Sequence, residues 1–439
     1  MTYLFDRDVT QGTIPWAVTN YFNAISVDAF SRQRTSDPYT LGDYKHLYGI
    51  DPNFIENTSN GGTVTFQPNQ ACARLSTSSA TNSTAIHQTK FYHHYMPGKS
   101  QLIMASFNFY TATSNVRKRT GYFDDNNGIF VEQAGDGTIA IVLRSYVSGA
   151  AIDRKYSQFG GVYGAGDTGW SYDACAGGSG GSKNPSGFTL DINKTQLLTM
   201  DFQWLGVGRI RVGFAHDGDF VLAHTFNGSN ELGTVYMSNP NLPLRCEIMN
   251  TGTTTGAYMD QICGTVVSEG GYVEAGQDWS ITSPSLRTIA AGATLPVMAI
   301  RLKGAFKTYA NRMIARMGNV GAFSAGANIK WRLVKLPDAA AVTGGSWVDV
   351  NTNSGVQYNA TLTAITGGEE MDAGWVGAST QGALKAGGAP GSNIPSTAKK
   401  NYIVQNYDST DSEIFAIQIV NVDSGSTDVG VALQWREIY

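Results

Sequence analysis

The chain has 439 residues, of which only 15% are charged, with a formal net charge of −4 at pH 7 and 51 glycines. No basic cluster is longer than 117–119, which argues against nucleic-acid binding through phosphate neutralisation. No apolar run approaches the ~18 residues of a membrane helix, so we expect no membrane insertion. The first residues lack the basic head and apolar core of a signal peptide, and we expect synthesis in the cytosol.

Residues 1–60 are rich in aromatic side chains and show no amphipathic period. Because exposed aromatics at this density would make a monomer prone to aggregation, we expect an extended arm that packs on a neighbouring domain or subunit. The aromatic positions are Tyr3, Phe5, Trp16, Tyr21, Phe22, Phe30, Tyr39, Tyr44 and Tyr48.

From residue 61 onward, period-two alternation predicts β-strands. The clearest stretch is 197–226, where Gly206–Gly208 and the hairpin signal Asp217-Gly218 separate three alternating runs. We expect a jelly-roll-like β-sandwich over 61–271, with a long Gly/Ser loop at 160–187. The apolar side of the third run is predicted to hold Phe220, Leu222, His224 and Phe226.

Residues 272–295 are expected to be a linker, and 296–439 a second β-sandwich. Its spacing of short strands is typical of a sandwich. One stretch, 306–317, also fits a helical stripe of apolar residues; its strand-rich surroundings and Gly318 favour strands, but both alternatives stay open. The predicted fold is therefore all-β, with a jelly-roll sandwich, a second C-terminal sandwich and an N-terminal arm.

No cofactor or metal site is predicted. The segment Asp124–Gly128 has the composition of a calcium loop, but it lacks the EF-hand register and its terminal Glu, so we predict an Asn-Gly turn. His93 and His94 are adjacent on a strand and point to opposite faces, which suits one metal poorly. Gly206–Gly208 lacks the third glycine and the helix of a dinucleotide loop.

No catalytic residue is predicted either. The sequence contains neither a nucleophile-elbow motif nor a zinc-protease motif. Paired carboxylates could cleave a glycoside without any local motif, but the candidate acids are scattered among turns and strand faces. These acids are Glu132, Asp136, Asp201, Asp217 and Asp219.

Six residues are candidates for an interface or for glycan contact. They are Trp170, Trp204, Arg209, Arg211, Tyr146 and Tyr163. The aromatic members could form a sugar-stacking platform, yet Tyr and Trp are equally typical of protein interfaces and cores. The two arginines lie on a polar strand face, where we expect them to contact carboxylates of a partner subunit.

The four cysteines contain no CxxC pair and are predicted to be free thiols, buried or partly buried. They are Cys72, Cys175, Cys246 and Cys263.

Several stretches together resemble structural proteins of tailed bacteriophages. They are VDAFSRQRTSDPYTL (27–41), YMPGKSQLIMAS (95–106), 119–149, 190–214, LPLRCEIMN (242–250) and WREIY (435–439). The resemblance implies a virion component. Separately, the order of strands, Gly-Asp-Gly and Asp-Gly turns is similar to lectin-type jelly rolls of the laminin-G or concanavalin kind, although the acids of a lectin metal site are not recognisable.

We therefore expect a non-enzymatic virion protein that is assembled in the host cytoplasm. A tail, baseplate or fibre component that self-assembles through its arm and sandwich faces, as a homotrimer and with other virion proteins, is the first hypothesis. A capsid decoration protein and a module that binds host-surface glycan are the alternatives. The glycan hypothesis predicts an exposed Trp170 or Trp204 on a groove, and an enzyme would need two facing carboxylates about 5–10 Å apart.

Overall fold

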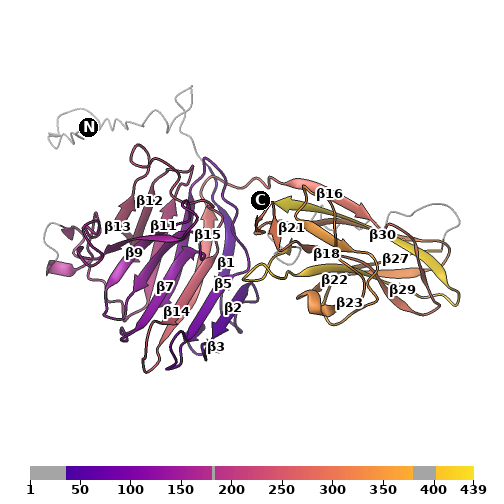
Figure 1. The fold of residues 1–439 in the computed structure, drawn as a ribbon, viewed down its shortest axis with the longest axis horizontal. Helices are drawn as coiled ribbons and strands as arrows, with labels where there is room; N and C mark the ends of the chain where they lie inside the picture. The colour runs from indigo at the N-terminus through magenta and orange to yellow at the C-terminus, as the bar shows by residue number, and fades with distance from the viewer. Residues whose placement is uncertain (1–35, 180–182, 379–401) are drawn as a thin grey trace, which may run out of the picture. The chain divides into compact units, whose positions relative to one another are not determined.

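The computed structural model describes residues 36–179, 183–378 and 402–439. Within them, Pro38–Tyr439 form one compact unit that contains two β-sandwiches (Figure 1). The N-terminal sandwich comprises strands β1–β15 and the C-terminal sandwich strands β16–β30. Residues 1–35 of the predicted arm lie outside the described residues.

One layer of the N-terminal sandwich is an eight-stranded antiparallel sheet. Its order is β13-β12-β11-β6-β15-β4-β3, with β1 pairing beside β15. The strands are β1 (Tyr39–Lys45), β3 (Thr63–Gln67), β4 (Cys72–Ser76), β6 (Gln101–Asn108), β11 (Gln196–Phe202), β12 (Ile210–His216), β13 (Asp219–Phe226) and β15 (Tyr258–Ser268).

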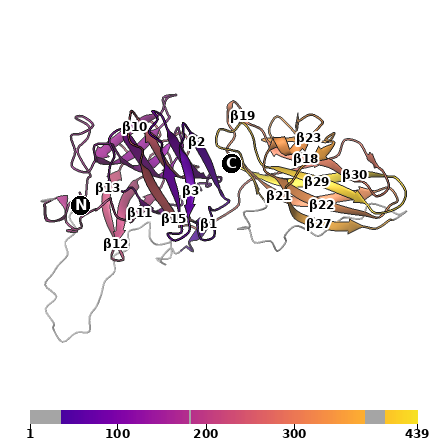
Figure 2. The same cartoon turned by 90° about the horizontal axis from the view of Figure 1, so that it is seen from below.

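The second layer is a seven-stranded sheet in the order β10-β9-β8-β7-β14-β5-β2. Figure 2 separates the layers, with β10 and β2 in one and β13, β12 and β11 in the other. The strands are β2 (Phe54–Ser59), β5 (Thr84–Thr89), β7 (Val116–Phe123), β8 (Gly128–Gln133), β9 (Ile139–Ser145), β10 (Ile152–Ser157) and β14 (Leu244–Asn250).

Alternation places the core between these layers. Leu198, Met200 and Phe202 of β11 are fully buried and belong to the same core cluster as Ile129 and Ile141 of the opposite sheet. The turn between β12 and β13 is the predicted Asp-Gly hairpin turn, because Asp217 and Gly218 take positive φ values of 52° and 89°. The prediction of an all-β jelly-roll sandwich is confirmed.

The third predicted run needs a correction. A β-bulge in β13 leaves Val212 opposite His224 and Gly213 opposite Leu222, so Ala223 is the extra residue. Between the start of β13 and the bulge, the side chains that would face the core by simple alternation therefore face outward, and the reverse holds for their neighbours. Val221 and Ala223 therefore pack on the core, while Phe220 is 41% exposed, contrary to the predicted apolar side.

The N-terminal sandwich starts earlier than predicted, because residues from 39 on belong to it and not to an arm. β1 pairs with β15, and β2 pairs with β5. The ring of Tyr44 lies 5.4 Å from that of Phe54, and both are buried. A register shift between Thr40 and Gly42 breaks the period-two alternation of side chains, which explains why the sequence pattern does not predict β1.

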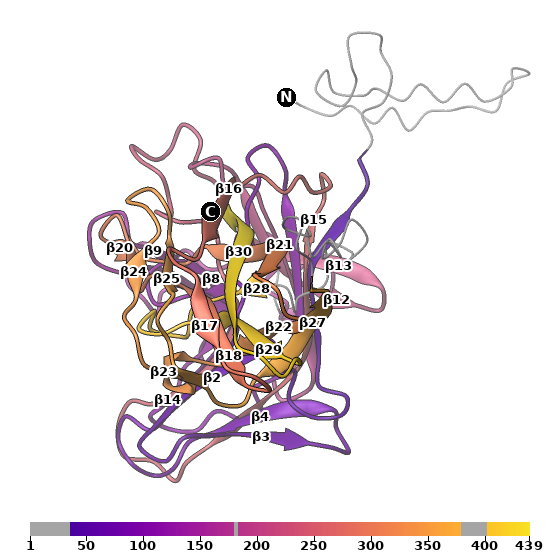
Figure 3. The same cartoon turned by 90° about the vertical axis from the view of Figure 1, so that its right-hand side faces the viewer.

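The C-terminal sandwich packs a five-stranded sheet on a six-stranded one, around a core of its own. Figure 3 shows β30 in yellow, which pairs with β16, β17 and β21. The first sheet contains β16 (Gln277–Thr282), β17 (Arg287–Ile289), β21 (Ile314–Ser324), β28 (Tyr402–Ile403) and β30 (Thr427–Ile438). The second contains β18 (Thr294–Leu302), β22 (Ile329–Leu336), β24 (Val348–Asp349), β25 (Val356–Asn359), β27 (Glu369–Val376) and β29 (Ile414–Asn421).

Short elements complete this sandwich and settle two predictions. The ribbons are β19 (Ala305–Phe306) with β20 (Tyr309–Ala310), and β23 (Val342–Thr343) with β26 (Ala364–Ile365). Residues 306–317 thus form strand and turn, not helix. The predicted linker, 272–295, contains β16, β17 and the first two residues of β18, so the sandwich begins near residue 277. Among the described residues, no helix is long and apolar enough to span a membrane.

The four cysteines are free thiols, as predicted, but the prediction that all of them are buried or partly buried is wrong for one. Cys72, Cys175 and Cys246 are buried, while Cys263 on β15 is exposed. Burial raises the pKa of Cys72 to about 11 and that of Cys175 and Cys246 to about 12. Three of the thiols are therefore both inaccessible and protonated at neutral pH.

Candidate functional site

The outer face of the seven-stranded sheet carries a network of buried ion pairs. Arg119 on β7 binds Glu132 on β8 with Nε and Oε2 2.7 Å apart, and its Nη1 lies 3.5 Å from Oε1 of Glu247 on β14. Lys155 on β10 lies 2.7 Å from the other oxygen of Glu132. The guanidinium of Arg119 also rests on the ring of Phe130, 4.9 Å from its centroid. Cross-strand neighbours thus neutralise one another on a face that water hardly reaches.

The electrostatics of this network bear on catalysis by paired carboxylates. Burial raises the pKa of Glu247, but the guanidinium groups of Arg245, Arg119 and Arg117 bring it down to about 2. The pKa of Glu132 is also lowered, because Arg119 and Lys155 outweigh the effect of burial. A glycosidase needs one carboxyl group with a raised pKa as its acid. Neither glutamate has that property, so this network holds the sheet together.

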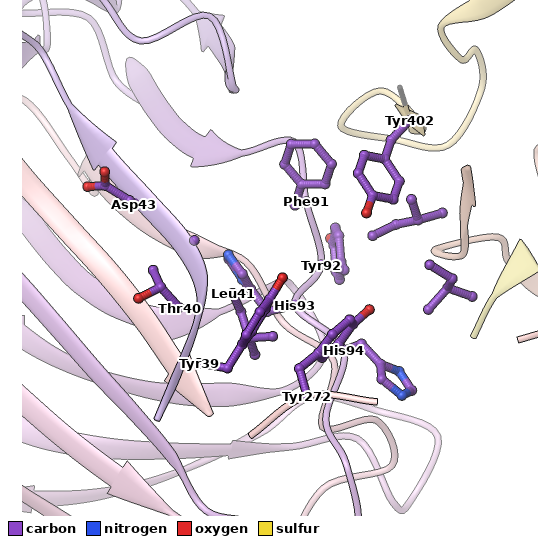
Figure 4. A pocket seen from close by; sticks show the side chains of 13 residues that line it. Tyr39, Thr40, Leu41, Asp43, Phe91, Tyr92, His93, His94, Tyr272 and Tyr402 are labelled. Atoms are coloured by element: carbon purple, nitrogen blue, oxygen red, sulfur yellow. The ribbon is translucent and has the colours of Figure 1, made fainter. Parts of the chain in front are cut away.

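A second feature is an aromatic pocket of about 350 Å³. Its walls come from the start of β1, from residues 91–94 after β5, from Tyr272 after β15, and from Ile314, Tyr402 and Ile438 of the C-terminal sandwich (Figure 4). The five aromatic residues of this aromatic pocket are Tyr39, Phe91, Tyr92, Tyr272 and Tyr402.

The rings of the aromatic pocket are ordered by contacts with one another. Tyr39 and Tyr272 stack with their ring centroids 4.9 Å apart and an interplanar angle of 14°. Phe91 meets Tyr402 edge-to-face at 5.9 Å, and the guanidinium of Arg312 lies 4.7 Å from the centroid of Tyr92. The walls therefore have fixed orientations before any ligand enters.

Polar contacts next to the aromatic pocket join the two sandwiches. Lys90 Nζ lies 3.3 Å from Glu413 Oε1, and the hydroxyl of Tyr407 donates to Asp125 Oδ2 at 2.8 Å. The ring of Tyr407 also contacts Arg245, whose guanidinium carbon lies 5.5 Å from the ring centroid. These contacts bring Tyr402 and the N-terminal wall residues to the same cavity.

A third feature is the run of exposed apolar side chains in residues 146–163, which lie before, on and after β10, the outer strand of its sheet. The members of this apolar surface are Tyr146, Val147, Ile152, Phe159, Val162 and Tyr163, and Phe159 is 72% exposed. They make up six of the twenty large apolar residues that are exposed in the described part of the chain, within only eighteen positions. Concentration of this kind marks an interaction surface more often than scattered exposure does.

The predicted tryptophans lie inside the protein. Trp170 is fully buried, and its Nε1 donates to the carbonyl of Tyr156 at 2.9 Å. Trp204 is partly buried against the core, and its Nε1 donates to the carbonyl of Met237 at 3.1 Å. Both indole groups therefore form hydrogen bonds within the N-terminal sandwich. The prediction of an exposed Trp170 on a groove is wrong.

The predicted arginines and tyrosines lie in different parts of the N-terminal sandwich. Arg211 forms an ion pair with Asp201 on the neighbouring strand of its own chain, which corrects the expectation of a partner subunit's carboxylate for that residue. Arg209 is exposed. Tyr146 and Tyr163 are 37% and 36% exposed and both belong to the apolar surface. The structure thus places two of the six predicted residues on the segments that flank β10.

The candidate metal ligands are engaged within the protein. Asp124 Oδ1 accepts from the backbone N–H groups of Asn126 and Asn127, each at 2.8 Å. The turn is therefore centred on Asp125-Asn126, and Gly128 is the first residue of β8, which corrects the predicted Asn-Gly turn. His93 is hydrogen-bonded to Tyr44, and His224 Nδ1 accepts from Ser171 N. The described ranges contain no group of three or more His, Cys, Asp or Glu residues that could hold a metal ion.

Sequence reasoning did not find the aromatic pocket, because its rings come from positions 39, 91–92, 272 and 402. No local motif links these positions, and only the packing of the two sandwiches brings them together. Phe159, directly before the long Gly/Ser loop, and Val162 within it were missed, and their apolar side chains beside small residues were the available signal.

Comparison with known proteins adds only weak similarity. No protein-family model and no curated protein matches the chain. A protein of unknown function from Shewanella oneidensis is similar with a TM-score of 0.33 and 6% identity, covering 59% of this chain and 100% of that chain. A glycoside hydrolase family 16 endo-glucanase from Bacteroides ovatus has a TM-score of 0.32 and 11% identity, covering 51% and 99%. The CBM2 module of the evolved Dit of Lactobacillus casei BL23 phage J-1 has a TM-score of 0.33 and 8% identity, covering 55% and 100%. Similarity at this level assigns no function.

Proposed function

We propose that the chain is a non-enzymatic structural protein of a bacteriophage particle, which associates with further copies of itself through the apolar surface around β10. The observation that carries the self-association is the concentration of exposed apolar side chains there, from Tyr146 to Tyr163. The resemblance of stretches such as 27–41 and 435–439 to phage structural proteins supports the particle. The ion pairs of Glu132 and Glu247 support a structural role for the sheet face next to the apolar surface.

A second copy of the chain is the occupant that this surface fits best. β10 pairs with β9 alone among the described strands, so it presents the outer edge of a sheet beside the apolar side chains. An unpaired edge next to an apolar surface favours association with another chain.

Light scattering coupled to size-exclusion chromatography tests the association. We expect the wild type to elute as an oligomer, with the predicted trimer at three times the 47.0 kDa chain mass. The double variant Phe159→Ser/Val162→Ser should elute as a monomer with an unchanged circular dichroism spectrum. The matched control, Tyr309→Ser, removes a side chain that is 77% exposed outside the apolar surface and should leave the oligomer intact.

A wild type that is monomeric at micromolar concentration, or a double variant with the wild-type mass, would refute the association. The place in the particle is tested by antibody labelling in electron microscopy. Label on the tail, baseplate or fibre supports the first placement, and label on the capsid supports the decoration alternative. Particles that contain the chain nowhere would refute the proposal.

A further inference from the structure

We propose that the aromatic pocket binds one ring of a neutral saccharide. The site differs from the predicted tryptophan platform, since Trp170 and Trp204 are packed inside the N-terminal sandwich and do not line this pocket. The inference is independent of the proposed self-association, because the apolar surface and the aromatic pocket have no residue in common.

The size and shape of the pocket suit a sugar ring. Its volume of about 350 Å³ is at the lower end of the roughly 300–1,000 Å³ of small-molecule sites, which leaves room for one ring and its substituents. The stacked pair Tyr39 and Tyr272 forms one wall, and the pair Phe91 and Tyr402 another (Figure 4). An aromatic ring presents a flat apolar surface to the C–H face of a sugar, and tyrosine adds a hydroxyl at its edge.

The charge of the lining selects a neutral ligand. The described residues that line the aromatic pocket include no lysine or arginine and one carboxylate, Asp43, which forms an ion pair with Lys45 at 3.2 Å. His94 adds no charge at neutral pH, because burial lowers its pKa further than the backbone of Tyr439 raises it. Among the described lining residues, an anionic ligand such as a uronic acid would therefore find no lysine or arginine to bind.

A tyrosine hydroxyl at one wall is available to bond sugar hydroxyls. The hydroxyl of Tyr272 makes no hydrogen bond to a described residue, and burial raises its pKa, so it keeps its proton and can donate. A hydroxyl donor at the edge of the stacked aromatic wall can hold one hydroxyl of a polyhydroxylated ring.

Isothermal titration of the full chain tests the inference, with the methyl glycosides of glucose, galactose and N-acetylglucosamine as neutral probes and glucuronic acid as the anionic one. We expect at least one neutral glycoside to bind with a dissociation constant in the micromolar to millimolar range, and glucuronic acid to bind at least 10-fold more weakly. Tyr272→Ala should weaken binding at least 10-fold, and Tyr272→Phe by less, because it keeps the ring and loses only the hydroxyl.

The control variant is Tyr309→Ala, which removes an exposed tyrosine outside the pocket and should bind as the wild type does. Thermal melting of each variant shows that it is folded. Absence of binding by all three neutral glycosides, equal binding of glucuronic acid, or an unchanged affinity in a folded Tyr272→Ala would each overturn the inference. The oligomeric state of Tyr272→Ala should equal that of the wild type, so failure here leaves the self-association test unaffected.

Discussion

At the scale of single residues, Arg119 has the most demanding environment. It is the only described cation that contacts both Glu132 and Glu247, and all three side chains are 6% exposed or less. Removing one member of a buried ionic group leaves its partners charged in a medium that cannot solvate them, which typically costs about 3–5 kcal/mol.

We expect Arg119→Met to lower the free energy of unfolding by about 3–5 kcal/mol. Arg211→Met, which breaks a pair in which the arginine is 42% exposed, should cost less than about 1 kcal/mol. Urea titration followed by circular dichroism measures both. Equal losses in the two variants would show that burial does not govern the strength of these pairs.

Buried histidines make the stability depend on pH. Burial lowers the pKa of His224 to about 4 and that of His87 to about 3. The unfolded chain takes up a proton near the usual value of about 6.5, whereas the folded chain resists it, so stability is complete above that pH and falls as the pH drops toward 4. Each of the two histidines should account for a loss of about 2 kcal/mol between pH 7 and pH 5.

His224→Phe should lose less stability than the wild type over this interval, whatever its stability at pH 7. Asp124 acts in the opposite direction because burial raises its pKa, but it does so equally in both proteins and cancels from the difference. His216→Phe, at a site where the imidazole is half exposed, should keep the wild-type dependence. Urea midpoints of the wild type and the two variants at pH 7 and pH 5 measure these losses of stability. Equal losses in all three proteins would contradict the role of His224.

At the scale of elements, the bulge in β13 determines which side chains face the core. Phe220→Ser should change the free energy of unfolding by less than about 0.5 kcal/mol, because the ring is 41% exposed. Phe214→Ala, on the paired strand β12, should cost about 3–5 kcal/mol, because that ring is fully buried. If Phe220→Ser lowered the free energy of unfolding as much as Phe214→Ala does, Phe220 would face the core. That result would contradict the bulge in β13 and agree with the uninterrupted alternation of the sequence.

Strands with regular alternation could be predicted from the sequence, and interrupted ones could not. β11 and β12 follow the period of two, and Asp217-Gly218 gives the turn between β12 and β13 directly. β1 and β13 each contain an irregularity that depends on the partner strand, and a single strand's sequence does not encode the register of its neighbour.

The candidate site was less predictable than the fold for a related reason. Tyr146 and Tyr163 were named because aromatic side chains are typical of sugar platforms and of protein interfaces. Trp170 and Trp204 carry the same signal, yet their N–H groups bond backbone carbonyls inside the sandwich. Burial separates the two kinds of aromatic residue, and burial is a property of the folded chain.

At the scale of the whole molecule, each sandwich has its own core. Phe202 belongs to the first and Phe415 to the second, and both are buried. Contacts such as Lys90 with Glu413 join the sandwiches through partly exposed charges, which typically contribute about 0–1 kcal/mol each. The cores should therefore unfold separately.

Differential scanning calorimetry should show two transitions. Phe202→Ala should lower the temperature of one and Phe415→Ala that of the other, since each removes a ring worth about 3–5 kcal/mol from one core only. A single transition that both variants lower equally would mean that the two sandwiches unfold as one cooperative unit.

The difference among the four cysteines has a practical use. Because Cys263 is exposed while Cys72, Cys175 and Cys246 are buried, Ellman's reagent should titrate one thiol per native chain and four in denaturant. More than one fast-reacting thiol in the native protein would contradict this. A maleimide dye on Cys263 would then mark every copy once, so the fluorescence of a single assembly would report how many chains it contains.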